Sequence, residues 1–253
     1  MAITGIDHLV IAVRDPDGAA DALGRGLGLA FTGGGRHEDA GTWNRLAFLG
    51  DTYLELIGVF DRGLVLANAA FAVGRAALAV LDAGREGLAT WALATDDCLA
   101  EASRLRASGS PIGTPIEGSR RRPDGEVVRW LTAFPTLGPE EPPFLIEHEP
   151  VGAEWGAAAR AARAAFRHPA GGTLRVARVE LPVADPAAAA ARWRTVLGIE
   201  FGLDGRATVG NQVVEVCAPG PGTQPVVRIV AIDGDVAPLD AVRLGVRWRI
   251  IGR

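Results

Sequence analysis

The sequence predicts an α+β protein built from repeated β-α-β-β-β units. The first observation is residues 5–59, where strand-like stretches flank a single helix that begins at Asp15. The second is the agreement of residues 50–55 with residues 210–215, both of which end in glutamate. The third is an aspartate-to-glycine spacing of 13 positions that recurs three times: Asp15 to Gly28, Asp96 to Gly109 and Asp185 to Gly198. Together they indicate an internal repeat.

Each element of the first unit follows from local sequence. Residues 5–13 are apolar and β-branched, which favours a strand. Asp15 can cap a helix and Pro16 suits its first turn, so the helix is expected to continue through Leu27 and end at Gly28. Three more strands are expected at 31–35, 44–49 and 52–59.

The second and third units repeat this order less regularly. In the second unit we expect a strand at 89–95, a helix at 96–105, a tight turn at 122–126 and strands at 127–133 and 143–149. In the third, a strand at 176–183 precedes an alanine-rich helix that opens at Asp185-Pro186. Two further strands are expected at 226–232 and 242–250.

Connecting segments suggest the domain organisation. Helices are expected at 64–81 and 153–166, and His168, in a glycine-rich linker, is expected to face solvent. The expected divisions are a domain at 1–150 with modules at 1–60 and 87–150, a helix and linker at 151–172, and a third module with extra strands at 173–253.

Composition excludes several classes of protein. A net charge of −4 argues against a nucleic-acid binder, and no apolar run is long enough to cross a membrane. All 26 basic residues are arginine, so Schiff-base lysine chemistry is excluded. The excess of Ala, Gly and Arg resembles a bacterial-type composition bias, which discounts arguments from arginine abundance. With two cysteines and no visible signal peptide, we expect a cytoplasmic protein whose partner is a small molecule.

Residues 3–150 carry an ordered set of short motifs. They are Asp7-His8-Leu9-Val10, Asp15-Pro16, Gly34-Gly35-Arg36-His37, Gly41-Thr42-Trp43-Asn44, Tyr53-Leu54-Glu55-Leu56, Trp91, Arg122-Pro123-Asp124-Gly125, Trp130 and Pro143-Phe144-Leu145-Ile146-Glu147. In this order they resemble the glyoxalase-like domain family of the vicinal oxygen chelate superfamily. Residues 173–253 resemble only its general module.

The resemblance implies tandem modules that form one curved mixed sheet around a divalent metal. Each module would give one ligand from its first strand and one from its fourth. His8 and Glu55 hold these positions in the first module, and Glu147 holds the fourth-strand position in the second. Ala89 or Thr90 stands at the remaining position, so three ligands are expected, for Mn²⁺, Mg²⁺, Fe²⁺, Zn²⁺ or Ni²⁺. The alternative is a cup that has lost its metal.

The resemblance also implies a metal-dependent enzyme for substrates with adjacent oxygens. Lyase, isomerase or dioxygenase chemistry would pass through a metal-stabilised enolate, with Glu55 or Glu147 as base. The alternative is a non-catalytic protein that sequesters a small molecule. His37 could move a proton, whereas His148 is expected to face away from Glu147 and to bind no metal. The expected substrate-binding residues are Asn44, Arg120, Arg122 and Trp130.

Strand periodicity makes two more predictions. Ile6, His8 and Val10 should share one face of the first strand. In the third module Arg178 occupies the position of His8, so an ion pair with Glu215 should replace the metal and leave this module structural. Its sheet has no partner module in the chain, so either the two extra strands or a second subunit, in a homodimer, should cover it.

Overall fold

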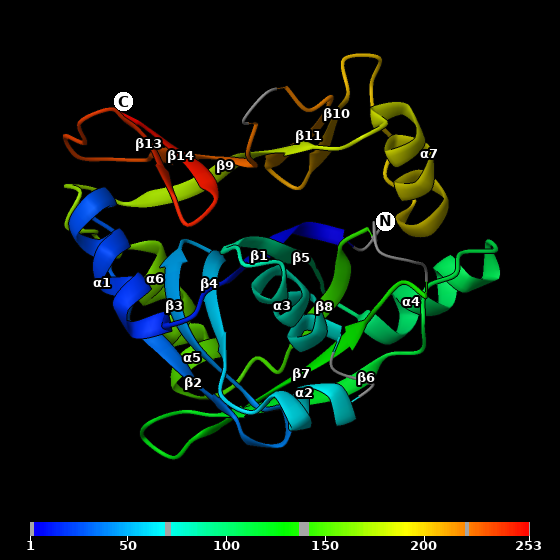
Figure 1. Ribbon diagram of the computed structural model, residues 1–253, viewed down its shortest axis with the longest axis horizontal. Helices are drawn as coiled ribbons and strands as arrows, with labels where there is room; N and C mark the ends of the chain where they lie inside the picture. Colours follow the sequence, from blue (N-terminus) through cyan, green and yellow to red (C-terminus); the bar gives the residue numbers. More distant parts are fainter. Residues whose placement is uncertain (1–2, 69–71, 137–141, 221–222, 253) are drawn as a thin grey trace.

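The computed structural model describes residues 3–68, 72–136, 142–220 and 223–252 (Figure 1). Strands from the N-terminal part close into a barrel, and strands from the C-terminal part form a second, six-stranded sheet stacked on it. Helices lie outside and at the ends of the barrel. This arrangement confirms the predicted α+β class with tandem modules.

The barrel contains two modules that meet along their first strands. Its strands are β1 (Ile3–Ala12), β2 (Gly33–His37), β3 (Thr42–Leu49), β4 (Thr52–Val59), β5 (Gly87–Thr95), β6 (Ile116–Arg121), β7 (Val127–Ala133) and β8 (Phe144–His148). Their order is β1-β4-β3-β2-β6-β7-β8-β5. In each module the first and fourth strands are parallel neighbours, β1 with β4 and β5 with β8. At the opposite edge, β2 and β6 meet at the pair Arg36 and Arg121.

The helices of the two modules begin at aspartate caps. In α1 (Pro16–Leu27), the Asp15 side chain accepts a hydrogen bond from the backbone, and Gly28 ends the helix at φ 66°. In α4 (Cys98–Ala107), Asp97 plays the same part. Helix α1 begins where the sequence predicted, whereas α4 and β2 each begin two residues later than expected and β6 was not predicted.

Two predicted helices are each divided. Instead of one helix at 64–81, the structure has α2 (Arg62–Ala67) and α3 (Ala72–Asp82), and residues 69–71 lie outside the described part. Instead of one helix at 153–166, α5 (Gly152–Trp155) and α6 (Ala157–Ala164) meet at Gly156, whose extended backbone interrupts the helix.

Both divided segments close the interior of the barrel. From α3, Val73 and Ala77 pack on the inward side chains of β1 and β4 beyond Glu55. From α5, Trp155 packs on Phe48 and Tyr53 on the other side of that glutamate. A polar layer therefore lies inside the barrel between two apolar layers.

The second sheet reproduces the pairing at the centre of the barrel. Its strands are β9 (Leu174–Pro182), β10 (Arg206–Val209), β11 (Gln212–Cys217), β12 (Val226–Ala231), β13 (Leu239–Arg243) and β14 (Val246–Ile251). The third module also contains α7 (Pro186–Leu197). β9 is parallel to β11 and antiparallel to β12, which is parallel to β14. Because β1 pairs likewise with β4 and β5, the last strands act as a reduced fourth module. The single strand expected at 242–250 is wrong, since β13 and β14 turn at Leu244-Gly245.

The predicted ion pair of the third module is confirmed. Arg178 pairs with Glu215 across β9 and β11, and the same carboxylate accepts a hydrogen bond from Arg206 at 3.1 Å. The third module therefore carries a charged pair where the first carries His8 and Glu55.

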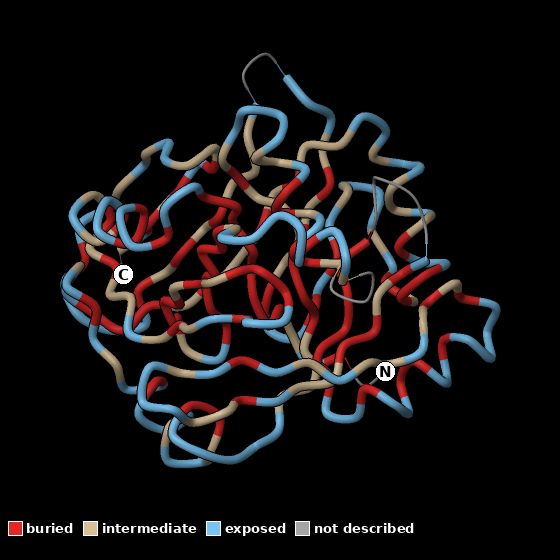
Figure 2. Tube along the Cα trace, turned by 60° about the horizontal axis from the view of Figure 1, so that its bottom comes forward, coloured by how far each residue is buried: buried red, intermediate tan, exposed pale blue. Residues whose placement is uncertain are grey.

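One apolar core joins the barrel to the second sheet. Leu9 and Ile11 on the outer face of β1 belong to the same buried cluster as Val179 and Trp248 from the second sheet. Figure 2 shows buried segments running through the middle of the molecule, with exposed segments around them. The barrel itself therefore covers the third module, so the expectation that the extra strands or a second subunit would cover it is wrong: the extra strands extend the same sheet. His168 is buried, not solvent-facing, and its Nε2 donates to the Phe48 carbonyl at 2.9 Å.

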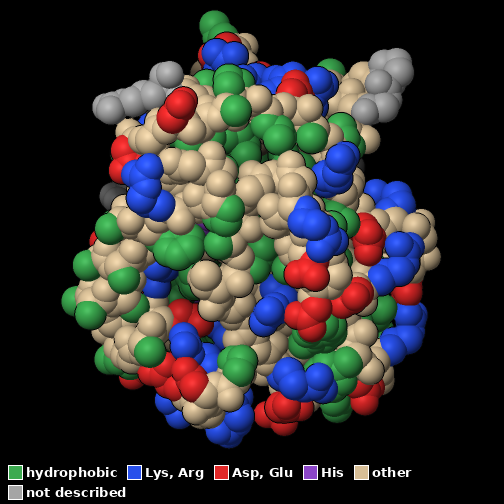
Figure 3. Space-filling model, turned by 90° about the vertical axis from the view of Figure 1, so that its left-hand side faces the viewer, with side chains coloured by type: hydrophobic (Ala, Val, Ile, Leu, Met, Phe, Trp, Pro, Cys, Tyr) green, Lys and Arg blue, Asp and Glu red, His purple; other side chains and the backbone are tan. Residues whose placement is uncertain are grey.

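The outer surface mixes charges of both signs. On the face in Figure 3, arginines and acidic side chains are interspersed, without a continuous basic patch on the described residues. No helix in the described part of the chain is long and apolar enough to span a membrane.

Candidate active site

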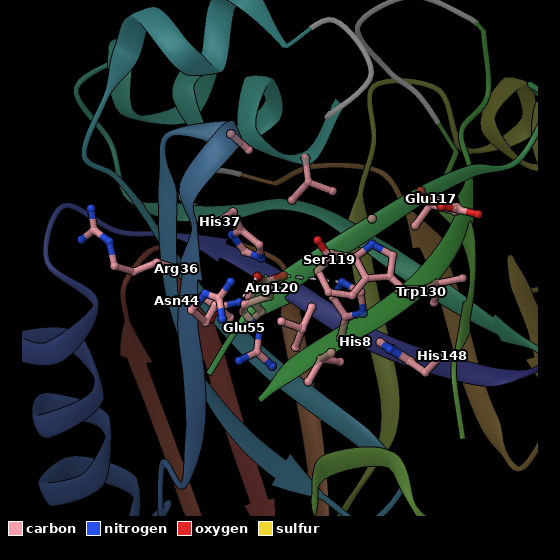
Figure 4. Close-up of a pocket in the computed structure, with 18 of the residues that line it drawn as sticks. His8, Arg36, His37, Asn44, Glu55, Glu117, Ser119, Arg120, Trp130 and His148 are labelled. Carbon is pink, nitrogen blue, oxygen red and sulfur yellow. Dashed lines mark hydrogen bonds and ion pairs between the residues drawn. The ribbon is translucent and has the colours of Figure 1, made fainter. Parts of the chain in front are cut away.

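A cavity of about 310 Å³ occupies the interior of the barrel. Tyr53, Trp130 and Phe144 supply part of its apolar wall. Its lining includes a group of polar side chains from several strands, all buried except the partly buried His148 (Figure 4): His8, His37, Asn44, Glu55, Arg120 and His148. Its volume suits a small molecule.

His8 and Glu55 come together as the sequence predicted. β1 and β4 are parallel neighbours, with His8 opposite Tyr53 and Val10 opposite Glu55. The two side chains point to the same inner face, and Nε2 of His8 lies 3.6 Å from Oε2 of Glu55. Both residues are buried, so each needs a polar partner inside the barrel.

A β-bulge adds Asp7 to this pair. The register between β1 and β5 shifts between Ile6 and His8, so Asp7 is an extra residue in the ladder. Ile6 consequently faces the core between the sheets, and the prediction that it shares a face with His8 is wrong. The Asp7 carboxylate accepts a hydrogen bond from Nδ1 of His8 at 2.6 Å and another from Nε2 of His148 at 3.1 Å.

The two histidines keep Asp7 ionised. Burial alone would raise the pKa of this carboxyl. His148 and His8 act in the opposite direction, through their charges and their hydrogen bonds, and they hold the pKa well below its usual range. An ionised carboxylate only accepts, so His8 must donate its Nδ1–H. The other ring nitrogen of His8, Nε2, faces Glu55.

Asn44 holds the other oxygen of Glu55. Its Nδ2 donates to Oε1 of Glu55 at 2.6 Å, while its Oδ1 accepts from the backbone N–H of Gly35 at 2.9 Å. We expected Asn44 to contact substrate. It lines the cavity, but both ends of its amide are already engaged in orienting the carboxylate.

Glu147 does not join the other two expected ligands. Its Oε2 accepts a hydrogen bond from the backbone N–H of Cys98 at 2.8 Å, at the start of α4 and outside the barrel. The expected convergence is wrong because the inward residues of β8 are Phe144, Ile146 and His148. Since a strand alternates its faces, an error of one residue in register exchanges Glu147 for His148.

His37 and Trp130 both line the cavity, and their rings meet edge to face with centroids 6.0 Å apart. The Nδ1 of His37 forms a hydrogen bond with the Thr42 hydroxyl at 2.8 Å. Burial, with the nearby charge of Arg120, lowers the pKa of His37 to about 3. Near neutral pH this ring is therefore uncharged, which suits it to a hydrogen bond with substrate better than to the role of an acid.

Arg120 and Arg122 both bind Glu154. Arg120 is buried, lines the cavity and pairs with Glu154 and the Gly34 carbonyl. Arg122 donates to the other oxygen of Glu154 at 3.0 Å and also pairs with Asp124. Arg120 therefore reaches the site as predicted, whereas Arg122 lies outside the cavity lining and supports Glu154 from behind.

The geometry of His8 and Glu55 fits a divalent cation. A separation of 3.6 Å is too long for a hydrogen bond but is one that two ligands of a single ion can have. Asp7 behind His8 and Asn44 behind Glu55 resemble the outer-sphere partners that orient metal ligands. Asp7, His8 and His148 also bring potential ligand atoms within 4.8 Å of one another. From the second module, the lining includes the carboxylate of the exposed Glu117 on β6, and the expected ligand Glu147 lies outside it.

Sequence reasoning missed five contributors to this site: Asp7, Tyr53, His148, Glu154 and Trp155. Asp7 reaches the site through a β-bulge, and the regular alternation of apolar and polar residues along a strand gives no signal of a bulge. His148 was misplaced by register. Trp155 stacks on the His148 ring at 3.6 Å, from a segment that the sequence presented as a connecting helix. The one available signal was composition, since a large aromatic residue beside an acid, Glu154-Trp155, is unusual in a linker.

Comparisons with known proteins agree with this architecture. A family profile described as a glyoxalase-like domain matches residues 6–197. A hypothetical protein from Staphylococcus aureus is similar in structure, with a TM-score of 0.76, 17% identity and coverage of 98% of this chain and 99% of that one. A mutant of 4-hydroxymandelate synthase from Streptomyces coelicolor is similar with a TM-score of 0.52 and 14% identity, and the match covers 92% of this chain and 72% of that one.

Methylmalonyl-CoA epimerase from Mycobacterium tuberculosis is a third structure, with a TM-score of 0.42, 22% identity and coverage of 60% of this chain and 91% of that one. A search of curated proteins finds no match. At 17% and 14% identity, the first two structural likenesses establish the fold alone.

Proposed function

Because the chain belongs to the glyoxalase-like domain family of the vicinal oxygen chelate superfamily, whose members are typically metal-dependent enzymes, we propose that it is a metal-dependent isomerase or lyase. Its substrate would be a small molecule with adjacent oxygens. His8 and Glu55 would hold the cation inside the barrel. The observation that carries this proposal is the approach, to 3.6 Å, of Nε2 of the buried His8 and Oε2 of the buried Glu55.

The residues around the cavity have distinct parts in the proposed reaction. Bound there, a divalent ion would polarise a substrate carbonyl. Asn44 restrains Oε1 of Glu55, so Oε2 would hold the cation. Once released from the cation, Oε2 would be the oxygen able to take a proton from the carbon beside that carbonyl. His37, uncharged near neutral pH, would form a hydrogen bond with a substrate oxygen.

The cavity also restricts the substrate. The apolar layers formed by α3 and by Trp155 limit access of water on both sides of Glu55. Within about 310 Å³, aromatic side chains favour a compact, partly apolar molecule. Arg120 adds positive charge to the wall, although Glu154 largely neutralises it.

Titration with Mn²⁺ tests this proposal. The wild type should bind one Mn²⁺ per chain, and His8→Ala and Glu55→Gln should each weaken binding at least about tenfold. Glu147→Gln is the matched control, because its carboxylate lies outside the cavity at α4. Calorimetry with circular dichroism as a check of folding would measure this. Equal affinity in the wild type and His8→Ala would overturn the metal site.

A second candidate is a protein that sequesters a small molecule without catalysis. The observation that favours it is the second module, which presents Phe144 and Ile146 to the cavity where the family pattern has a carboxylate ligand. This candidate takes the lead if the wild type binds no Mn²⁺ but binds an aromatic probe such as 1-anilinonaphthalene-8-sulfonate in the barrel. Trp130→Ala should then weaken that binding.

A further inference from the structure

The third module reaches into the first strand of the barrel through one buried side chain. Gln212 lies at the start of β11, after a turn in which Gly210 packs against the Thr4 carbonyl. A Cβ on Gly210 would lie 2.1 Å from that carbonyl oxygen, so the close approach requires glycine. The turn therefore delivers Gln212 to the backbone just before the bulge at Asp7.

The amide of Gln212 completes the hydrogen bonding of Ile6. Its Oε1 accepts from the backbone N–H of Ile6 at 2.6 Å, and its Nε2 donates to the Thr52 hydroxyl at 2.8 Å. That hydroxyl donates to the Ile6 carbonyl at 2.8 Å. The regular pairing of β1 with β4 begins at His8, so these two side chains continue the ladder beyond its end.

The hydrogen bonds of Gln212 and Thr52 to Ile6, called the clamp below, hold the backbone next to the bulge. Gln212 also donates to the Val176 carbonyl of β9 at 3.2 Å, which ties the clamp to the second sheet. Downstream of the clamp, the extra residue Asp7 turns its carboxylate to Nδ1 of His8. Ordinary alternation would send neighbouring side chains to opposite faces, so the contact depends on the bulge.

We infer that Gln212 is a positioning residue of the barrel site. Through Ile6 and Thr52 it maintains the bulge that brings Asp7 to His8, and Asp7 in turn fixes the Nδ1–H tautomer of His8 with Nε2 directed at Glu55. The third module thus acts on the site without contributing a side chain to its cavity. The tautomer rests on the contacts of Asp7 with Nδ1 of His8 and with His148, whereas the consequence for metal binding rests on the proposed function.

The test uses the full chain with Gln212→Met, which keeps the side-chain volume and removes all three hydrogen bonds. Thr52→Val removes the other half of the clamp and serves as a second variant. Ser110→Ala is the matched control, because Ser110 is buried and donates to the Val196 carbonyl across the same interface, away from the bulge.

Two measurements separate positioning from stability. Long-range proton–nitrogen spectra report the tautomer of His8, and with four histidines in the chain, His8→Gln assigns its signal. The wild type and Ser110→Ala should show the Nδ1–H form, and both clamp variants should lose it. Mn²⁺ affinity should fall about tenfold in the clamp variants and stay unchanged in the control.

The outcomes distinguish this inference from the proposed function. Wild-type binding of Mn²⁺ with an unchanged tautomer and affinity in folded Gln212→Met and Thr52→Val would overturn the role of Gln212. No binding of Mn²⁺ to the wild type would overturn the proposed metal site, while the tautomer comparison would still decide whether Gln212 positions His8. A loss of tautomer in Ser110→Ala as well would make the effect one of general stability and overturn the inference.

Discussion

His8 is held from both sides by groups whose own partners are fixed. Asp7 accepts from Nδ1 at 2.6 Å, and Glu55, held by Asn44, faces Nε2 at 3.6 Å. The residue types at His8 and Glu55 could be chosen from strand position and family pattern. Their partner Asp7 could not, because a bulge is a backbone irregularity that depends on Gln212, more than 200 positions away in the sequence.

At the same scale, the lowered pKa of His37 predicts how the free energy of unfolding changes with pH. Its pKa is about 3 when folded and close to 6.5 when unfolded, so between these values the unfolded chain binds more protons. The free energy of unfolding should therefore fall as pH decreases below about 6.5, by about 1.4 kcal/mol per pH unit for one proton. His168, whose pKa burial also lowers, adds in the same direction, and Asp7 contributes only below about pH 4.

Urea unfolding at pH 7, 6 and 5 measures this slope. His37→Gln can retain a hydrogen bond to Thr42 and removes one titrating group, so its stability should fall less steeply with acid than that of the wild type. Parallel pH profiles for the two proteins would show that His37 is protonated in the folded state.

At the scale of elements, β4 and β11 place chemically equal glutamates in different surroundings. Glu55 lies in the closed barrel beside an imidazole, and Glu215 lies in the open second sheet beside Arg178 and Arg206. The repeat correctly predicted both positions from matching segments. It failed at β8, where register is set by pairing with β5 and β7 and not by the local pattern.

Matched substitutions separate these two glutamates. Glu215→Gln should lower the free energy of unfolding by about 1–2 kcal/mol, because it leaves a partly buried Arg178 with a weaker partner, and should leave Mn²⁺ affinity unchanged. Glu55→Gln should lower Mn²⁺ affinity, and it should change the free energy of unfolding less than Glu215→Gln does. Chemical denaturation and calorimetry on both variants measure the two effects. A Glu215→Gln variant that loses Mn²⁺ binding would contradict the assignment of the third module to structure.

At the scale of the molecule, the barrel and the second sheet share one apolar core. Leu9 and Leu54 from the barrel and Val179 and Trp248 from the second sheet are all completely buried in it. Gln212 and His168 add hydrogen bonds across the same junction. If either layer unfolded alone, the apolar side chains of the other layer would be exposed to water, so the two layers should unfold together.

Trp248→Ala tests this cooperativity. Deleting a fully buried indole should cost about 3–5 kcal/mol. We expect a single transition by far-UV circular dichroism and tryptophan fluorescence in the wild type, and a parallel shift of both signals in the variant. A second transition, with the barrel unfolding as before, would show that the layers are independent.

The sequence by itself determined the repeated units, the caps of α1 and α7, and the positions of His8, Glu55 and the Arg178–Glu215 pair, because each depends on contacts within one module or on local backbone preference. Only the tertiary structure decided that Glu147 leaves the site, that His148 and Asp7 enter it, and that α3 and Trp155 close the barrel. Those features depend on strand register and on side chains delivered from distant elements. A shift of one residue in the pairing of a strand moves every side chain of that strand to the other face of the sheet. Local sequence carries too little information to specify the register.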